Sequence, residues 1–233
     1  MTWRLLLAGI MLLPAAAAEA RTRTQLRSDV RLLLRDTGTS RVRFSDAQIN
    51  VLLNEGQRLA ASRSYCVQKS TTFPLLVGTT YYATKSDFLA VRRLTRDSIE
   101  LKELTPAGLD GRTRGWEAAA GIPTWYFLNF ASRTQVGFSP FPGVSADTST
   151  IRMDYFALPS DMDADGTQAF DNIAELVPYH QILAYYAASV LAAVDGDQPA
   201  SQLYLALFET GLKSMTDKCQ DRPNYNPSFV GRQ

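Results

Sequence analysis

The chain has 233 residues, of which 45% are hydrophobic and 20% are charged, and its formal net charge is +1 at pH 7. This composition excludes a disordered or fibrous chain, and the near-neutral charge argues against a protein that binds nucleic acid by neutralising phosphates. Two cysteines and a single histidine exclude a disulfide framework and a metal site built from several histidines.

The first 20 residues form a signal-like leader. Arg4 precedes an apolar run over residues 5–13, and the small residues that follow end in Ala-Glu-Ala, which fits cleavage before Arg21. The run is shorter than the ~20 residues that a transmembrane helix needs. The alternatives to an export signal are a short helix that packs on a partner and a start codon assigned too far upstream.

Residues 21–70 predict the first of two helix pairs. Thr22 and Gln25 form a capping box, apolar residues follow at helical spacing, and Gly38 is suited to the left-handed position after the helix. The opposite face is either solvated or docks on an acidic partner. It carries four arginines: Arg23, Arg27, Arg31 and Arg35.

The second helix of this pair is expected to begin after Ser45. Ser45 and Gln48 form another capping box, and an apolar stripe runs from Ile49 to Ala60. Gly56 lies in that stripe, where a glycine costs about 1 kcal/mol relative to alanine. We therefore expect another helix to cross closely at Gly56.

Residues 71–169 predict an inserted β-rich domain. Short runs of β-branched and aromatic residues are separated by glycine and proline, which is typical of an antiparallel sheet or a small sandwich. The aromatic runs at residues 125–130 and 138–141 fit the core of such a sheet. The alternative is a platform on which a sugar or a single nucleic-acid strand stacks.

Helical periodicity returns in residues 170–218. Pro178 suits the first position of one helix, residues 195–197 (Asp-Gly-Asp) end it, and Pro199 starts the last helix. Neither helix pair can bury its apolar stripe alone. The expected fold class is therefore α+β: a four-helix bundle formed by the N- and C-terminal helix pairs, with an inserted antiparallel β-sheet or sandwich and an extended C-terminal arm.

The arm comprises residues 219–233. It contains two prolines and a glycine, and it is too short and interrupted to fold by itself. Its isolated aromatics, Tyr225 and Phe229, are the candidate partner-binding residues, because buried aromatic anchors dominate the energy of many interfaces.

One local motif carries candidate metal ligands. Asp161, Asp163, Asp165 and Gly166 match positions 1, 3, 5 and 6 of a calcium-binding loop, but position 12 is Asn172 rather than glutamate. The motif is therefore either a calcium loop or a solvated acidic connector, and we favour the connector. No other cofactor is expected.

The remaining reactive side chains give little sign of catalysis. His180 is expected to be a satisfied core or surface histidine, and a hydrolase that uses it is the weakest alternative. The sequence has no nucleophile elbow, P-loop or dinucleotide fingerprint.

In an oxidising compartment Cys66 and Cys219 are able to pair, and such a link would close a loop of roughly 150 residues and stabilise the fold by about 4–5 kcal/mol.

The chain resembles the head-to-tail adaptor, or connector, proteins of tailed bacteriophages, including the tail tubular protein A type. The resemblance extends from about Thr24 to Met215. Four segments carry it in order: Arg43-Phe44-Ser45-Asp46-Ala47-Gln48-Ile49, Gly121-Ile122-Pro123-Thr124-Trp125-Tyr126, Val136-Gly137-Phe138-Ser139-Pro140-Phe141-Pro142, and Val177-Pro178-Tyr179-His180 with Ala184-Tyr185-Tyr186-Ala187-Ala188.

The resemblance implies a structural virion protein without catalytic activity. Such a protein forms a ring, usually of twelve copies, that binds the portal protein, receives the tail or nozzle protein, and surrounds double-stranded DNA without sequence-specific contacts. It is assembled in the host cytoplasm and lies in the neck of the virion. Because the leader is typical of export, the alternative is a periplasmic binding module whose β insert recognises a glycan or a protein partner.

Overall fold

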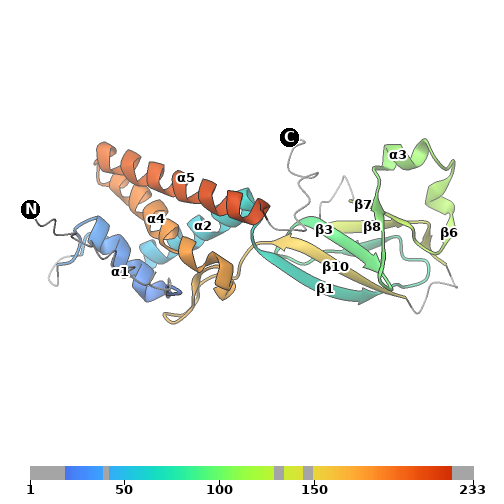
Figure 1. Ribbon diagram of the computed structural model, residues 1–233, viewed down its shortest axis with the longest axis horizontal. Coiled ribbons are helices and arrows are strands. Elements are labelled where there is room, and N and C mark those ends of the chain that lie inside the picture. Colours follow the sequence, from blue (N-terminus) through green and yellow to red (C-terminus); the bar gives the residue numbers. More distant parts are fainter. Residues whose placement is uncertain (1–18, 39–41, 129–133, 144–148, 222–233) are drawn as a thin grey trace, which may run out of the picture.

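The structure is a computed structural model, and it describes residues 19–38, 42–128, 134–143 and 149–221. Figure 1 shows an elongated molecule with the long helices at one end and the strands at the other. Residues 1–18 of the signal-like leader and the aromatics Tyr225 and Phe229 lie outside the described residues, so their predicted roles stay predictions. The α+β class is confirmed.

Four helices form the helical body. α4 is the most apolar of them, and it packs against each of the other three. Because its buried positions include several alanines and a serine, the neighbouring helices approach it closely. The helices are α1 (Arg23–Leu33), α2 (Asp46–Ser64), α4 (Gln181–Val194) and α5 (Gln198–Gln220).

Both predicted capping boxes are confirmed. The Thr22 hydroxyl accepts the backbone N–H of Gln25, whose side chain accepts the N–H of Thr22 in return. Ser45 and Gln48 make the same reciprocal pair at the start of α2. Each box supplies acceptors for N–H groups that have no partner inside the helix.

The predicted end of the first helix near Gly38 is wrong. α1 ends at Leu33, and Arg35 adopts the left-handed conformation with φ 53°. The N–H of Asp36 then donates to the carbonyl of Arg31, which completes a Schellman-type ending. An arginine is unusual in this position, and the contacts of the buried Asp36 carboxylate described below hold it there.

Two four-stranded sheets form most of the β-rich region. One sheet has the order β1-β10-β3-β4, with β1 (Gln68–Pro74), β3 (Phe88–Arg96), β4 (Ile99–Glu100) and β10 (Thr150–Ala157). The other has the order β2-β8-β7-β5, with β2 (Tyr81–Ala83), β5 (Lys102–Glu103), β7 (Trp125–Leu128) and β8 (Gln135–Ser139). The rings of Phe73 and Phe138 lie 6.4 Å apart, so side chains of the two sheets meet between them.

The β-rich region departs from the prediction in three respects. It begins at Gln68, it contains parallel pairings between β5 and β7 and between β6 (Ala120–Gly121) and β9 (Phe141–Pro142), and it is interrupted by helical turns. The turns are α3 (Pro106–Asp110) and η1 (Trp116–Ala118). The Thr105 hydroxyl caps α3 by accepting the N–H of Gly108. This helix was not predicted from the sequence.

The second helix pair also starts and ends differently. Two 3-10 turns, η3 (Ala169–Asn172) and η4 (Ala174–Tyr179), precede α4, so Pro178 lies inside η4 rather than at the first position of the helix. α5 continues to Gln220, so the predicted arm cannot begin at residue 219. No helix among the described residues has both the length and the apolarity of a membrane span.

A disulfide joins Cys66 to Cys219 across a sequence separation of 153 residues, with the two Cα atoms 5.5 Å apart. Cys66 follows α2 and precedes β1, whereas Cys219 lies in the last turn of α5. The bond therefore ties the C-terminal helix to the point at which the chain leaves the helical body for the sheets.

Gly56 marks a close helix crossing, as predicted. A Cβ atom at this position would lie 2.8 Å from Cδ1 of Tyr186 on α4. We expect Gly56→Ala to destabilise the fold by about 1–3 kcal/mol, because overpacking outweighs the ~1 kcal/mol gain in helix propensity. The test is the urea midpoint of unfolding, with Glu55→Ala at the adjacent exposed position as control. An unchanged or higher midpoint would contradict the crossing.

Candidate functional site

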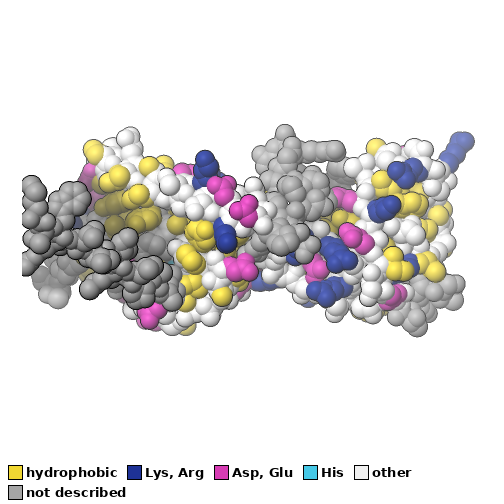
Figure 2. Space-filling view, viewed as in Figure 1, with side chains coloured by type: hydrophobic (Ala, Val, Ile, Leu, Met, Phe, Trp, Pro, Cys, Tyr) yellow, Lys and Arg dark blue, Asp and Glu magenta, His cyan; other side chains and the backbone are white. Residues whose placement is uncertain are grey.

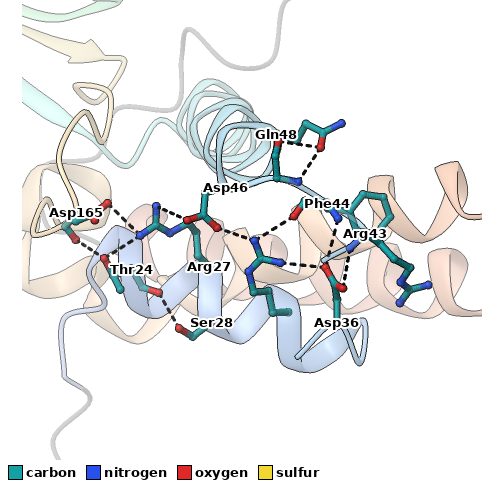
Figure 3. Close-up of polar contacts among 11 residues, drawn as sticks. Thr24, Arg27, Ser28, Asp36, Arg43, Phe44, Asp46, Gln48 and Asp165 are labelled. Atoms are coloured by element: carbon teal, nitrogen blue, oxygen red, sulfur yellow. Dashed lines mark hydrogen bonds and ion pairs between the residues drawn. The ribbon is translucent and has the colours of Figure 1, made fainter. Parts of the chain in front are cut away.

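The arginine face of α1 docks on acidic residues of the same chain (Figure 3). The guanidinium of Arg27 lies between two carboxylates, 3.1 Å from Asp165 and 3.5 Å from Asp46. On either side of it, Arg23 reaches Asp165 at 2.7 Å and Arg31 reaches Asp46 at 2.6 Å. These alternating charges, the arginine ladder, connect α1 to the start of α2 and to the segment before η3.

Asp36 is the buried end of the arginine ladder. Its side chain is 3% exposed and lies 3.0 Å from Arg31. It also accepts the backbone N–H groups of Arg43 at 3.0 Å and Phe44 at 3.4 Å (Figure 3). By accepting these two backbone N–H groups, Asp36 fixes how the chain turns from α1 into α2.

The outer carboxylates of the ladder are stabilised in their charged form. The hydrogen bond from Arg31 lowers the pKa of Asp46, and the hydrogen bond from Arg23 lowers the pKa of Asp165. Both side chains are more than half exposed, so water screens these pairs and each contributes little to stability.

The three aspartates of the predicted calcium loop have separate partners. Asp161 pairs with Arg58, Asp163 accepts the hydroxyl of Thr167 at 3.2 Å, and Asp165 belongs to the arginine ladder. Within the described part of the chain, no group of three or more His, Cys, Asp or Glu side chains is placed to hold a metal ion. Calcium binding at these aspartates stays a prediction.

His180 is buried in the helical body. Its Nδ1 accepts the backbone N–H of Arg21 at 3.0 Å, and its ring lies 5.9 Å from that of Phe170. Its Nε2 has no hydrogen-bond partner among the described residues. Burial lowers the pKa of His180 to about 4, so the imidazole is neutral at pH 7 and anchors the start of the fold.

A set of polar contacts at the junction between helices and sheets was missed from the sequence. The fully buried Gln57 donates to the carbonyl of Ser160 at 2.8 Å and accepts the N–H of Phe170 at 2.7 Å. Lys69 of β1 pairs with Asp87 and with Asp171, each at 3.0 Å. Although burial lowers the pKa of Lys69, these two hydrogen bonds raise it overall.

These contacts hold a strained segment in place. Phe170, Asp171 and Asn172 are three consecutive residues with left-handed φ values between 51° and 55°. Each such residue costs of order 1–3 kcal/mol unless its surroundings fix it. The Gln57 and Lys69 contacts therefore make the junction rigid, and glutamine or lysine gives no sequence signal for that role.

The predicted aromatic runs lie largely in the core. Tyr126, Phe127 and Phe138 are each at most 3% exposed, and Phe127 contacts Trp116 with ring centroids 5.1 Å apart. Their faces are therefore covered by protein. This burial favours the core interpretation over a stacking platform for the residues that the structure describes.

An apolar depression lies on the helical body, where Figure 2 shows exposed hydrophobic side chains. One hollow of about 420 Å³ lies between α2 and α4, and a second of about 460 Å³ lies between α4 and α5. Both are lined by Val190 and Val194, so they form one apolar groove with α4 as its floor. Its walls include Phe44, Ala47, Val51, Ser201 and Leu205.

α5 carries a second apolar surface. Leu203 and Leu207, which we call the leucine ridge, are 58% and 40% exposed and lie one helical turn apart. Leu205 of the apolar groove is two residues from each of them. Because successive residues of an α-helix are rotated by about 100°, the ridge and the groove lie on opposite sides of α5.

Comparison with models of protein families identifies a family for this chain. The family model described as SU10 adaptor protein matches residues 21–231, a range that includes both helix pairs and the β-rich region. No curated protein matches the chain. The family match agrees with the resemblance that four sequence segments indicated.

The buried position of Asp36 predicts a large effect of its removal. We expect Asp36→Ala to destabilise the fold by about 2–4 kcal/mol, because two backbone N–H groups lose their acceptor and the partly buried Arg31 loses an ion-pair partner. The exposed Asp46 is the matched control, and Asp46→Ala should cost less than about 1 kcal/mol. Equal costs in denaturant unfolding would show that Asp36 has no special role.

His180 predicts a pH dependence of stability. Because the pKa is about 4 in the folded chain and about 6.5 in the unfolded chain, the unfolded state binds the proton first as the pH falls. The free energy of unfolding is therefore highest above pH 6.5. Between pH 6.5 and pH 4 it falls by about 3 kcal/mol because of this proton. His180→Asn keeps an acceptor for the backbone N–H of Arg21 but cannot bind the proton. When unfolding by denaturant is measured from pH 7 to pH 4, the variant should lose less stability than the unchanged protein. Identical profiles for both proteins would contradict it.

Proposed function

Because the chain belongs to the SU10 adaptor protein family, a phage head-to-tail adaptor family, we propose that it joins the portal to the tail in the neck of the virion. The observation that carries this proposal is the family match over residues 21–231. The proposed role is structural and needs no catalytic step. Its partners are other copies of the chain, the portal protein and a tail or nozzle protein.

The proposed assembly is a closed ring, with twelve copies as the family resemblance implies. A cyclic ring needs two different surfaces on each subunit, one to bind each neighbour. The apolar groove and the leucine ridge lie on opposite sides of α5 and satisfy that requirement. We therefore assign the ridge of one copy to the groove of the next.

In this arrangement the helical body forms the rigid part of the ring as a four-helix bundle. The buried contacts of Asp36 and the disulfide between Cys66 and Cys219 support that rigidity. The sheets project from one end and contact the portal or the tail. Double-stranded DNA passes through the ring, and the formal net charge of +1 suits a wall that must not retain phosphates.

The alternative, a periplasmic binding module, depends on the signal-like leader. The family match covers nearly all of the chain that follows the leader. Three of the aromatic residues that would face a glycan, Tyr126, Phe127 and Phe138, are buried. These observations favour the virion neck as the location.

The direct test of the proposed function is to mix the purified chain with portal rings of the same phage. Negative-stain images should show the chain as an added ring on one end of the portal. A chain that stays monomeric and never binds portal rings would contradict the proposal.

The proposed ring contact predicts the behaviour of two single variants. Val194→Asp in the groove and Leu203→Asp in the ridge should each weaken assembly at least tenfold, which corresponds to ~1.4 kcal/mol, because a charge would enter an apolar contact. Both side chains are exposed in the single chain, so folding should persist. Assembly is measured by sedimentation velocity.

A mixture of the two variants distinguishes this contact from general loss of solubility. One partner keeps an intact ridge and the other an intact groove, so the mixture should form dimers that cannot grow into rings. Ile99→Asp on β4 is the matched control, because Ile99 is also 58% exposed and lies away from the helices. Rings formed by either single variant, or a mixture without dimers, would refute the assignment.

A further inference from the structure

We propose that the chain's own C-terminal segment, residues 222–230, adds to the sheet as a strand beside β1. This inference does not depend on the adaptor function or on the ring contact. It follows from the exposed edge of one sheet, the place where the described chain ends, and the pattern of the residues that remain.

β1 lies at the outer edge of its sheet (Figure 1). Its neighbour β10 is bonded through odd-numbered residues: Ala157 donates to the carbonyl of Val67, and Leu75 donates to that of Ser149, each at 3.0 Å. Because N–H and C=O groups alternate sides along a strand, the even-numbered residues of β1 point the other way. Among the described residues, no strand pairs with that side of β1. The outward-pointing residues are Gln68, Ser70 and Thr72.

A slot of about 300 Å³ opens beside this edge, between β1 and the residues that follow β2. Its walls include Thr71, Phe73 and Met153 from one side and Thr84 from the other. The Thr84 hydroxyl is buried and has no hydrogen-bond partner among the described residues. The slot thus combines apolar surface from Phe73 and Met153 with the hydroxyl group of Thr84.

The described chain ends close to this edge. The Cα atom of Cys219 lies 5.5 Å from that of Cys66, and β1 begins two residues after Cys66. Two residues span at most ~7 Å, so Cys219 lies within about 13 Å of the start of β1. Residues 222–233 span up to ~40 Å when extended, whereas the seven residues of β1 need ~23 Å. The segment is therefore long enough to reach along most of the edge, parallel to β1.

The sequence of the segment fits an edge strand. Pro223 and Pro227 are four positions apart, so both would point the side without an N–H group towards solvent, as edge-strand prolines do. The N–H groups of Asn224, Asn226 and Ser228 would then face β1. Because side chains alternate between the two faces of a strand, Tyr225 and Phe229 would share one face with the two prolines. Asn224, Asn226 and Ser228 would lie on the opposite face.

The two faces match those of β1. Thr71 and Phe73 point towards the interior of the sandwich, whereas Ser70 and Thr72 are exposed. The aromatic face of the segment would lie over the slot, and its asparagines would continue the exposed face. Tyr225 and Phe229 thus act as anchors within their own chain.

Hydrogen–deuterium exchange of the monomeric chain tests the proposal. Ending the chain at Asp221 leaves α5 and its disulfide intact. It should speed exchange of the Ser70 and Thr72 amides at least tenfold, while the amides of β8 stay unchanged. Equal exchange of these amides in the full and shortened chains would overturn the proposal.

A matched pair of variants tests the register. Asn226→Pro removes an N–H group that faces β1 and should expose the edge as the shortened chain does. Asn226→Ala keeps that group and should preserve protection. Protection that survives Asn226→Pro would refute the register, and protection that appears only upon self-association would assign the edge to a neighbouring copy or another protein.

Discussion

The structure depends on the burial of α4. This helix carries buried side chains on most of its surface and contacts α1, α2 and α5, so it cannot be covered by its sequence neighbour alone. The N-terminal helices must therefore pack against the C-terminal helices, although the whole β-rich region separates them in the sequence. The chain leaves and re-enters the helical body at one end, where Gln57, Lys69 and the disulfide hold the junction.

Features with a local cause were predictable from the sequence. The capping boxes at Thr22 and Ser45 depend on residues three positions apart, and the crossing at Gly56 depends on one glycine in an apolar stripe. The α+β class followed from the change between helical and alternating periodicity. These patterns predict the structure correctly because they depend only on residues close together in the sequence.

Features with a distant cause were not predictable. Arg35 takes the left-handed position because Asp36 is held by Arg31 and by residues seven and eight positions away, whereas local propensity favoured Gly38. Arg23 and Arg27 both pair with Asp165, which is more than 130 residues later in the chain. From the sequence alone, these arginines therefore indicated a solvated face or a face that binds a partner. The apolar groove likewise exists only because three helices from two parts of the chain meet.

Together these constraints make a stiff structural unit with apolar surfaces on two sides of α5, which suits an adaptor. Native-state hydrogen exchange of the monomer tests the central claim that both helix pairs fold as one body. The buried amides of Leu53 on α2 and Leu183 on α4 should open with the same free energy and the same denaturant dependence. If Leu53 stays protected while Leu183 exchanges, the two pairs are separate units and the account is wrong.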